Sequence, residues 1–268
     1  CFTINVISKN PPGFRKSHFR PGYLFHPLRI SRNGMIVYEN TKSGFIEDVV
    51  NGVIDTKIDR LILERMGRHT GLSEIRSWQN SLGRMGLVLS DEGIPGDAGI
   101  AIEYCIPYTP KRVDMIVSGK DEFSNGTAVV IELKQWSEVE KVEGMDGIVR
   151  TAISRGMRSV AHPSYQVWSY AMMISDYNST VQDESIGLSP CTYLHNYDTR
   201  ENDPLLDPIY SEYIELAPVF TKKDAAKLRD FIKKFVKYGD KGETIFKIDG
   251  GRLRPSKSLQ DSLVSMIE

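Results

Sequence analysis

Two stretches of the chain place charged side chains inside apolar, strand-like segments. Asp114 lies in RVDMIV, and Glu132 and Lys134 lie in VVIELKQW, directly after a run of β-branched residues. Side chains alternate between the two faces of a strand, so Glu132 and Lys134 point to the same side. Buried charges are normally paired or bound to a metal ion. The pattern therefore calls for partners around these three residues.

If the two segments pair as antiparallel strands, Asp114 and Glu132 lie side by side, with Lys134 on the same face. Two carboxylates at a strand end form a hard-oxygen site that suits Mg²⁺ or Mn²⁺. A divalent ion lowers the pKa of a water molecule that it binds and stabilises charge on a phosphoryl oxygen. Lys134 can orient that water or offset charge on the phosphorus. Taken singly, each charge also fits a structural salt bridge at a sheet end.

The spacing of apolar residues predicts the elements that would position this group. A helical period from Ser43 to Ile62 and a second helix over 73–88 precede three strands joined as an antiparallel meander. A helix that begins at Pro163 follows a longer connection. The expected elements are strands over 99–107, 111–119, 127–136 and 185–197, a short strand or extended segment over 213–220, an amphipathic helix from Thr221 with a capping pattern to Asp224, and a last helix within 254–268.

The helix after Pro163 adds a third motif, because two of its polar residues stand four apart and so share one face. In chain order the motifs are Asp114, then Glu132-Leu133-Lys134, then Gln166-Val167-Trp168-Ser169-Tyr170. This D…ExK…QxxxY pattern resembles the RecB-like branch of the PD-(D/E)xK nuclease superfamily over residues 70–197. The resemblance implies an α/β fold of the restriction-endonuclease-like type, a mixed sheet flanked by helices with an αβββαβ core.

The resemblance also implies a role for each residue of the pattern. Asp114, Glu132 and the main-chain carbonyl of Leu133 would be metal ligands, and Lys134 would be the catalytic lysine. Residues Gln166 and Tyr170 would position the nucleic-acid backbone or the water molecules of the site.

Other polar residues are candidates for supporting roles. The superfamily often takes a further acid from the helix before the first strand, for which Glu74 is the best match and Glu47 a competitor. Glu103 lies on the first strand and fits either a supporting role or an ordinary cross-strand pair. The longer connection carries three arginines that would either grip phosphates or form a solvated loop face, namely Arg150, Arg155 and Arg158.

A narrower resemblance concerns the domain context. The runs SW-x-NSL, IELKQW, HPS-x-Q and RPSK-x-L are similar to the amino-terminal region of bacterial proteins with a Schlafen-type DNA/RNA helicase domain. That likeness implies a helicase module as partner. The chain stops within a helix pattern, so we expect it to be a fragment. No GxxxxGK[ST] motif occurs, so we expect no ATP hydrolysis by this part.

The composition of the chain limits the classes of protein to which it can belong. The net charge of −1 neither requires nor excludes a nucleic-acid partner. Residues 1–34 contain no acid and six of the 34 basic residues, so they are expected to be a basic extension or leader. The three cysteines form no disulfide or metal pattern, and no apolar run is long enough to span a membrane, which together predict a reduced, cytoplasmic protein. A nuclease-like domain is expected over 35–240, and a C-terminal segment over 241–268.

The sequence thus predicts a metal-dependent nuclease that hydrolyses phosphodiester bonds in nucleic acid. DNA is favoured as its substrate, and the sequence leaves the choice between DNA and RNA open. The alternative is a module on the same fold that binds nucleic acid or another partner without cleavage. A chain that had lost catalysis would usually have lost one of Asp114, Glu132 and Lys134, which favours the enzyme.

Overall fold

A six-stranded mixed sheet forms the centre of the molecule in the computed structural model, which describes residues 36–153 and 156–267. The strand order is β1-β2-β3-β4-β8-β9. The first four strands pair antiparallel, and β4, β8 and β9 pair parallel. The strands are β1 (Ile36–Thr41), β2 (Gly99–Cys105), β3 (Arg112–Lys120), β4 (Gly126–Lys134), β8 (Gly187–Leu194) and β9 (Val219–Thr221).

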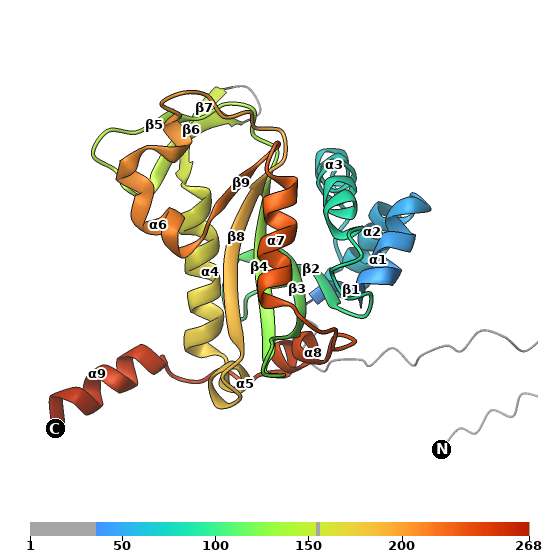
Figure 1. Cartoon of the computed structure of the whole chain (residues 1–268), viewed down its shortest axis with the longest axis vertical. Helices are drawn as coiled ribbons and strands as arrows, with labels where there is room; N and C mark the ends of the chain where they lie inside the picture. The colour runs from blue at the N-terminus through green and yellow to red at the C-terminus, as the bar shows by residue number, and fades with distance from the viewer. Residues whose placement is uncertain (1–35, 154–155, 268) are drawn as a thin grey trace, which may run out of the picture. The chain divides into compact units, whose positions relative to one another are not determined.

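Helices cover both faces of this sheet (Figure 1). On one face, α1 (Lys42–Val50), α2 (Ile54–Met66), α3 (Leu72–Leu89) and α7 (Ala225–Phe235) pack on strand residues such as Met115 and Val129. On the other face, α4 (Pro163–Tyr177), α5 (Ser179–Asp183) and α8 (Glu243–Gly250) pack on Ile116 and Val130. These adjacent residues serve opposite cores because side chains alternate along a strand. The expected α/β fold with helices on a mixed sheet is confirmed, in the order α3-β2-β3-β4-α4-β8.

Local sequence explains why α4 begins where it does. Pro163 occupies the first helical position, where its missing N–H costs nothing. The ring of His162 caps the helix, since its Nδ1 accepts a hydrogen bond from the Ser164 N–H at 3.2 Å. Its Nε2 lies 3.0 Å from the Leu205 carbonyl oxygen, so Nε2 carries the proton. Because Gln166 lies in the first turn of α4, the residue at which α4 begins determines where Gln166 lies along the sheet.

Several expected boundaries change in the structure. The helical period over 43–62 is divided into α1 and α2 because Gly52 adopts a positive φ of 65° between them. Residues 213–220 form the end of α6 (Ser211–Leu216) and the start of β9 rather than one extended segment. The helix expected from Thr221 begins instead at Ala225, and Thr221 lies in β9. The Thr221 hydroxyl still donates to Asp224 Oδ2 at 2.6 Å.

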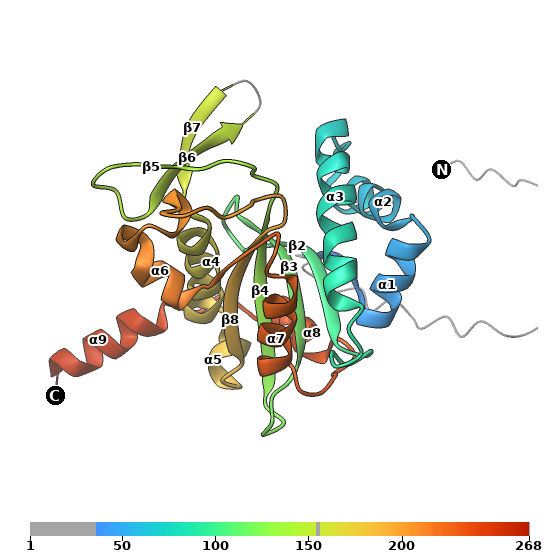
Figure 2. The same cartoon turned by 45° about the horizontal axis from the view of Figure 1, so that its top comes forward.

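The connection between β4 and α4 builds a second sheet that the sequence did not indicate. It contains β5 (Glu140–Lys141), β6 (Ile148–Ile153) and β7 (Gly156–Ala161), paired antiparallel in that order. Figure 2 shows the β6–β7 hairpin extending beyond the main sheet. Two short 3₁₀ helices, Pro204–Leu206 and Pro208–Tyr210, pack beside it, and α9 (Lys257–Ile267) ends the described chain.

The packed core continues past the expected domain boundary at residue 240. Ile245 and Ile248 of α8 are buried against the same cluster as Val130 and Val167. The described residues 36–153 and 156–267 belong to one compact unit. The basic residues of the expected extension lie outside the described residues. Cys105 and Cys191 are free thiols, and within the described part we find no helix of the length and apolar character that crossing a membrane requires.

Candidate active site

The two central strands separate where their charged residues lie. The β3–β4 ladder ends with the pair Met115 and Ile131. Beyond this pair, a side chain replaces the main-chain bonds of the ladder. Asp114 Oδ2 accepts a hydrogen bond from the Leu133 N–H at 2.8 Å. This contact holds the acid at the strand end beside Glu132. Asp114 is half-buried, whereas Glu132 is only 2% exposed.

A chain of polar contacts joins β4 to α4. Lys134 Nζ donates to Glu132 Oε1 at 2.6 Å and to Gln166 Oε1 at 3.1 Å. The Gln166 amide nitrogen donates to the same Glu132 oxygen at 2.6 Å and to the Tyr170 hydroxyl at 3.2 Å. Glu132 and Lys134 share the face of β4 that α4 covers, as their spacing predicts. The structure therefore brings the ExK and QxxxY motifs into direct contact.

Burial and mutual repulsion govern the protonation of the two acids. Burial raises the pKa of Glu132, and the neighbouring Asp114 raises it further, while Lys134 opposes both effects. The pKa of Asp114 is raised by burial against the lowering effects of Lys134 and the Leu133 N–H. Burial lowers the pKa of Lys134, but the two carboxylates outweigh it and raise the pKa above its ordinary value. The arrangement favours a charged lysine beside an acid pair that retains a proton.

A divalent cation fits the donors at this position. The second oxygen of Glu132, Oε2, is buried and has no hydrogen-bond partner among the described residues. An orphaned carboxylate oxygen beside a second carboxylate is the donor chemistry that Mg²⁺ or Mn²⁺ prefers. In the part of the chain that the structure describes, no three His, Cys, Asp or Glu side chains group as metal ligands. A metal held by this pair would thus need main-chain or water oxygens as well.

The predicted helix acid lies near the pair but is already engaged. Glu74 lines a cavity of about 130 Å³ together with Asp114 and Leu133. Its carboxylate forms two hydrogen bonds with Arg68, at 2.9 and 3.1 Å, and these contacts lower its pKa. Glu47 is exposed on α1 and does not line this cavity. Of the two candidates, the structure places Glu74 close to the site.

Glu103 also lines this cavity and is buried there. It is 7% exposed and has a positive φ of 58°, a strained conformation for a non-glycine residue. Trp78 Nε1 donates to its Oε1 at 3.0 Å, and Arg112 lies 2.6 Å from its Oε2 as an ion pair without hydrogen-bond alignment. Burial, followed by repulsion from Asp114, raises the pKa of Glu103 to about 7. The charged residue within the apolar run GIAIEYCIP was the sequence signal for this environment.

The three arginines of the long connection do not form one cluster in the described structure. Arg150 lies on β6 and pairs with Glu140 at 3.2 Å. Arg158 lies on β7 opposite Thr151, so it points to the other face of the hairpin from Arg150. Arg155 lies outside the described residues. The two described arginines are exposed, and their role as phosphate ligands stays a prediction.

Comparison with known proteins adds no relative to this description. No family model, no curated protein and no solved structure matches the chain.

Proposed function

We propose that this chain is a metal-dependent nuclease of the PD-(D/E)xK type that hydrolyses phosphodiester bonds, in DNA rather than RNA. One observation carries the proposal. Three separate elements, β3, β4 and α4, bring their polar residues to one strand end. Hydrogen bonds join Glu132, Lys134, Gln166 and Tyr170, and Asp114 is held beside Glu132 by the Leu133 N–H. Salt bridges for stability alone would not require a glutamine and a tyrosine from α4 in the same network.

Asp114 and Glu132 would hold Mg²⁺ or Mn²⁺, with the Leu133 carbonyl as the predicted main-chain ligand. When bound, such an ion supplies charge neutralisation at a phosphoryl oxygen and lowers the pKa of water. The Glu132 Oε2 atom is the free protein donor for it. The Leu133 N–H donates to Asp114 Oδ2 and so fixes the Asp114 carboxylate at the end of β3.

Lys134 supplies the positive charge of the site. Its Nζ stays protonated between the carboxylates, so it can donate a hydrogen bond to a phosphate oxygen as negative charge develops there. Gln166 fixes both groups, because its amide accepts from Lys134 and donates to Glu132. The Tyr170 hydroxyl accepts from Gln166 and retains its own proton for a bond to substrate or water.

Cleavage of labelled DNA tests the proposal. Linear and circular DNA, single- and double-stranded, would be incubated with Mg²⁺, with Mn²⁺ or with a chelator. The native protein should cut only with the ion, and Lys134→Ala should not cut. Lys120→Ala is the matched control, since Lys120 lies at the other end of β3 and its side chain forms a 3.7 Å ion pair with Glu243.

The binding module without catalysis predicts a different result. It would bind DNA equally well in native and Lys134→Ala forms and cut in neither, with affinity that depends on salt rather than on the divalent ion. That outcome would overturn the nuclease proposal. A helicase module as partner remains a prediction from the sequence.

A further inference from the structure

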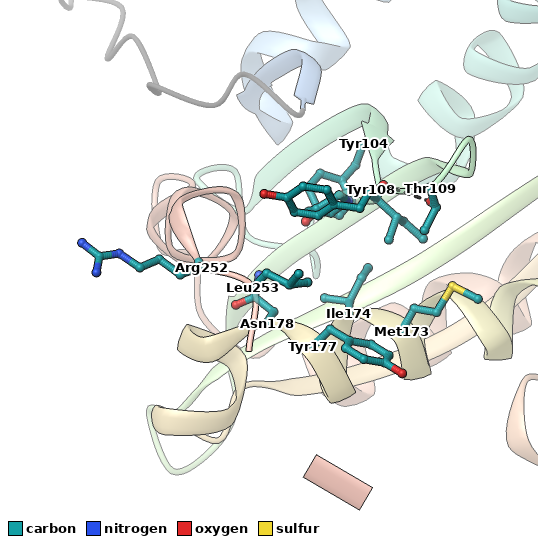
Figure 3. A pocket seen from close by; sticks show the side chains of 12 residues that line it. Tyr104, Tyr108, Thr109, Met173, Ile174, Tyr177, Asn178, Arg252 and Leu253 are labelled. Carbon is teal, nitrogen blue, oxygen red and sulfur yellow. Dashed lines mark hydrogen bonds between the residues drawn. The ribbon is translucent and has the colours of Figure 1, made fainter. Parts of the chain in front are cut away.

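A second cavity lies on the face of the sheet that α4 covers, the face of the network of Glu132, Lys134, Gln166 and Tyr170. Its volume is about 350 Å³, within the range of pockets that hold small ligands. Figure 3 shows Tyr104 and Tyr108 on one side of it and Ile174 and Tyr177 on the other. The guanidinium of Arg252, on the rim, points away from the cavity. A lining of aromatic and apolar groups suits a flat, uncharged ring.

Helix α4 connects this cavity with the candidate active site. Tyr170 contacts Gln166 in the catalytic network, and Tyr177, two turns further along α4, lines the cavity. At 1.5 Å per residue the two tyrosines are separated by about 10 Å along the helix, or roughly three stacked nucleotides at about 3.4 Å each. At the Tyr170 end of this path, Lys111 Nζ lies 5.3 Å from the centroid of the Tyr170 ring. A strand that runs from one site to the other would pass this cation with its phosphates.

The turn that carries Tyr108 presents the ring to solvent. Tyr108 is 88% exposed and has a φ of 59°, which few residues other than glycine adopt. The Ile106 N–H donates to the Lys111 carbonyl at 2.9 Å, and the Thr109 N–H and hydroxyl donate to the Ile106 carbonyl at 3.2 and 3.0 Å. These bonds hold the strained residue in place. The fixed main chain keeps the exposed ring beside the cavity, where another ring can stack on it.

Two polar side chains of the lining, Thr109 and Asn178, are already engaged. The Thr109 hydroxyl donates to Ile106 and accepts from the Lys111 N–H. The Asn178 amide donates to the Ile248 carbonyl and accepts from the N–H groups of Thr180 and Val181. Neither side chain is free to read the edge of a base. Most of the remaining lining is aromatic or aliphatic, so recognition here would rest on stacking and shape, which tolerate any sequence.

We propose that this cavity, the tyrosine pocket (Tyr104, Tyr108, Met173, Ile174 and Tyr177), binds a base of a single-stranded DNA substrate whose backbone passes Lys111 on its way to the catalytic group. The inference rests on the proposed nuclease function and adds the form of its substrate. A base inside a duplex would first have to leave its stack, which costs free energy. Single strands and frayed ends meet no such cost.

Binding of a fluorescein-labelled oligothymidylate, in the presence of a chelator so that no cleavage occurs, tests the pocket. Its affinity would be compared with that of an abasic strand of the same length. Tyr108→Gly removes the ring and retains a residue suited to the positive φ. This change should weaken binding of the normal strand by between about 5-fold and about 150-fold, and binding of the abasic strand by less than about twofold.

Two further variants make the result specific to the ring. Tyr108→Phe keeps the stacking surface and should bind like the native protein. Tyr238→Ala removes an equally aromatic, 57% exposed side chain outside the pocket and should also leave binding unchanged.

The inference is overturned if Tyr108→Gly binds the normal strand like the native protein, or if it weakens both strands equally, since the ring would then contact the backbone. Cleavage decides the other proposal separately. A protein that cuts DNA without this pattern refutes the pocket alone. A protein that shows the pattern but never cuts with Mg²⁺ or Mn²⁺ refutes the nuclease and leaves the base-binding pocket standing.

Discussion

The Asp114 carboxylate accepts a hydrogen bond from the main-chain N–H of Leu133 at 2.8 Å, across the gap where β3 and β4 separate. In a continued ladder, a main-chain carbonyl would occupy that position. The acid therefore satisfies a strand-end donor and is at the same time fixed beside Glu132. Its substitution affects both the fold and the candidate site, and the two effects can be separated.

Asp114→Asn and Asp114→Ala should differ in stability and agree in activity. The amide oxygen of Asn can still accept from Leu133 and removes a charge that repels Glu132, so its free energy of unfolding should equal or exceed that of the native protein without metal. Ala leaves the Leu133 N–H without this acceptor, at a cost of about 1–3 kcal/mol. Urea denaturation in chelator measures both, and neither variant should cut DNA. Equal destabilisation by both would mean that the charge itself supports the fold.

Addition of Mg²⁺ or Mn²⁺ should raise the melting temperature of the native protein. An ion that binds only the folded state stabilises it by about 2.7 kcal/mol at 100 times its Kd. Glu132→Gln should abolish the shift, because it removes a predicted ligand. Glu74→Gln should retain the shift, because the Glu74 carboxylate is bonded to Arg68 and not to the ion. Thermal melts with and without the ion give the answer, and loss of the shift in Glu74→Gln would make this residue a ligand after all.

Gln166→Ala should lower the cleavage rate by about 10- to 100-fold while the protein remains folded. The side chain positions Lys134 and Glu132 together, and partners that orient the groups of a metal site typically have effects of this size. The control is Gln79→Ala, since Gln79 donates at 2.6 Å to Asp55 on the exposed surface. Single-turnover cleavage separates the chemical step from binding. Equal rates in the two variants would exclude a positioning role for Gln166.

Glu103→Gln should change how stability depends on pH. Burial, followed by Asp114, raises the pKa of Glu103 from 4.5 to about 7 in the folded state. Between these two pKa values the folded state binds more protons than the unfolded state. Glu103 therefore lowers the free energy of unfolding of the native protein as the pH rises from 4.5 to about 7. The full loss corresponds to roughly 3 kcal/mol.

Since Gln does not titrate, the native protein should lose stability relative to Glu103→Gln between about pH 4.5 and pH 7. Urea denaturation of both proteins at several pH values measures this difference. A difference that stays constant with pH would mean that Glu103 ionises normally.

The sequence by itself determined the central layout. Apolar runs separated by turn residues predicted β2, β3 and β4, and Pro163 predicted the start of α4, because such runs and a first-turn proline are local properties of the chain. The order of Asp114, Glu132-x-Lys134 and Gln166-x₃-Tyr170 then indicated which faces would meet. The structure brings Glu132, Lys134, Gln166 and Tyr170 into one network.

Only the tertiary structure decided what surrounds these residues. Arg68 engages Glu74, although no pattern in the sequence links the two residues. Arg112 lies against Glu103, and the sequence had left open whether Glu103 forms such a cross-strand pair. The burial of Ile245 from α8 and the cavity beside Tyr108 also depend on segments far apart in the chain. Contacts of this kind arise when whole elements pack together and exclude water. Which surfaces pack together depends on the whole chain, so it leaves no periodic pattern in the sequence.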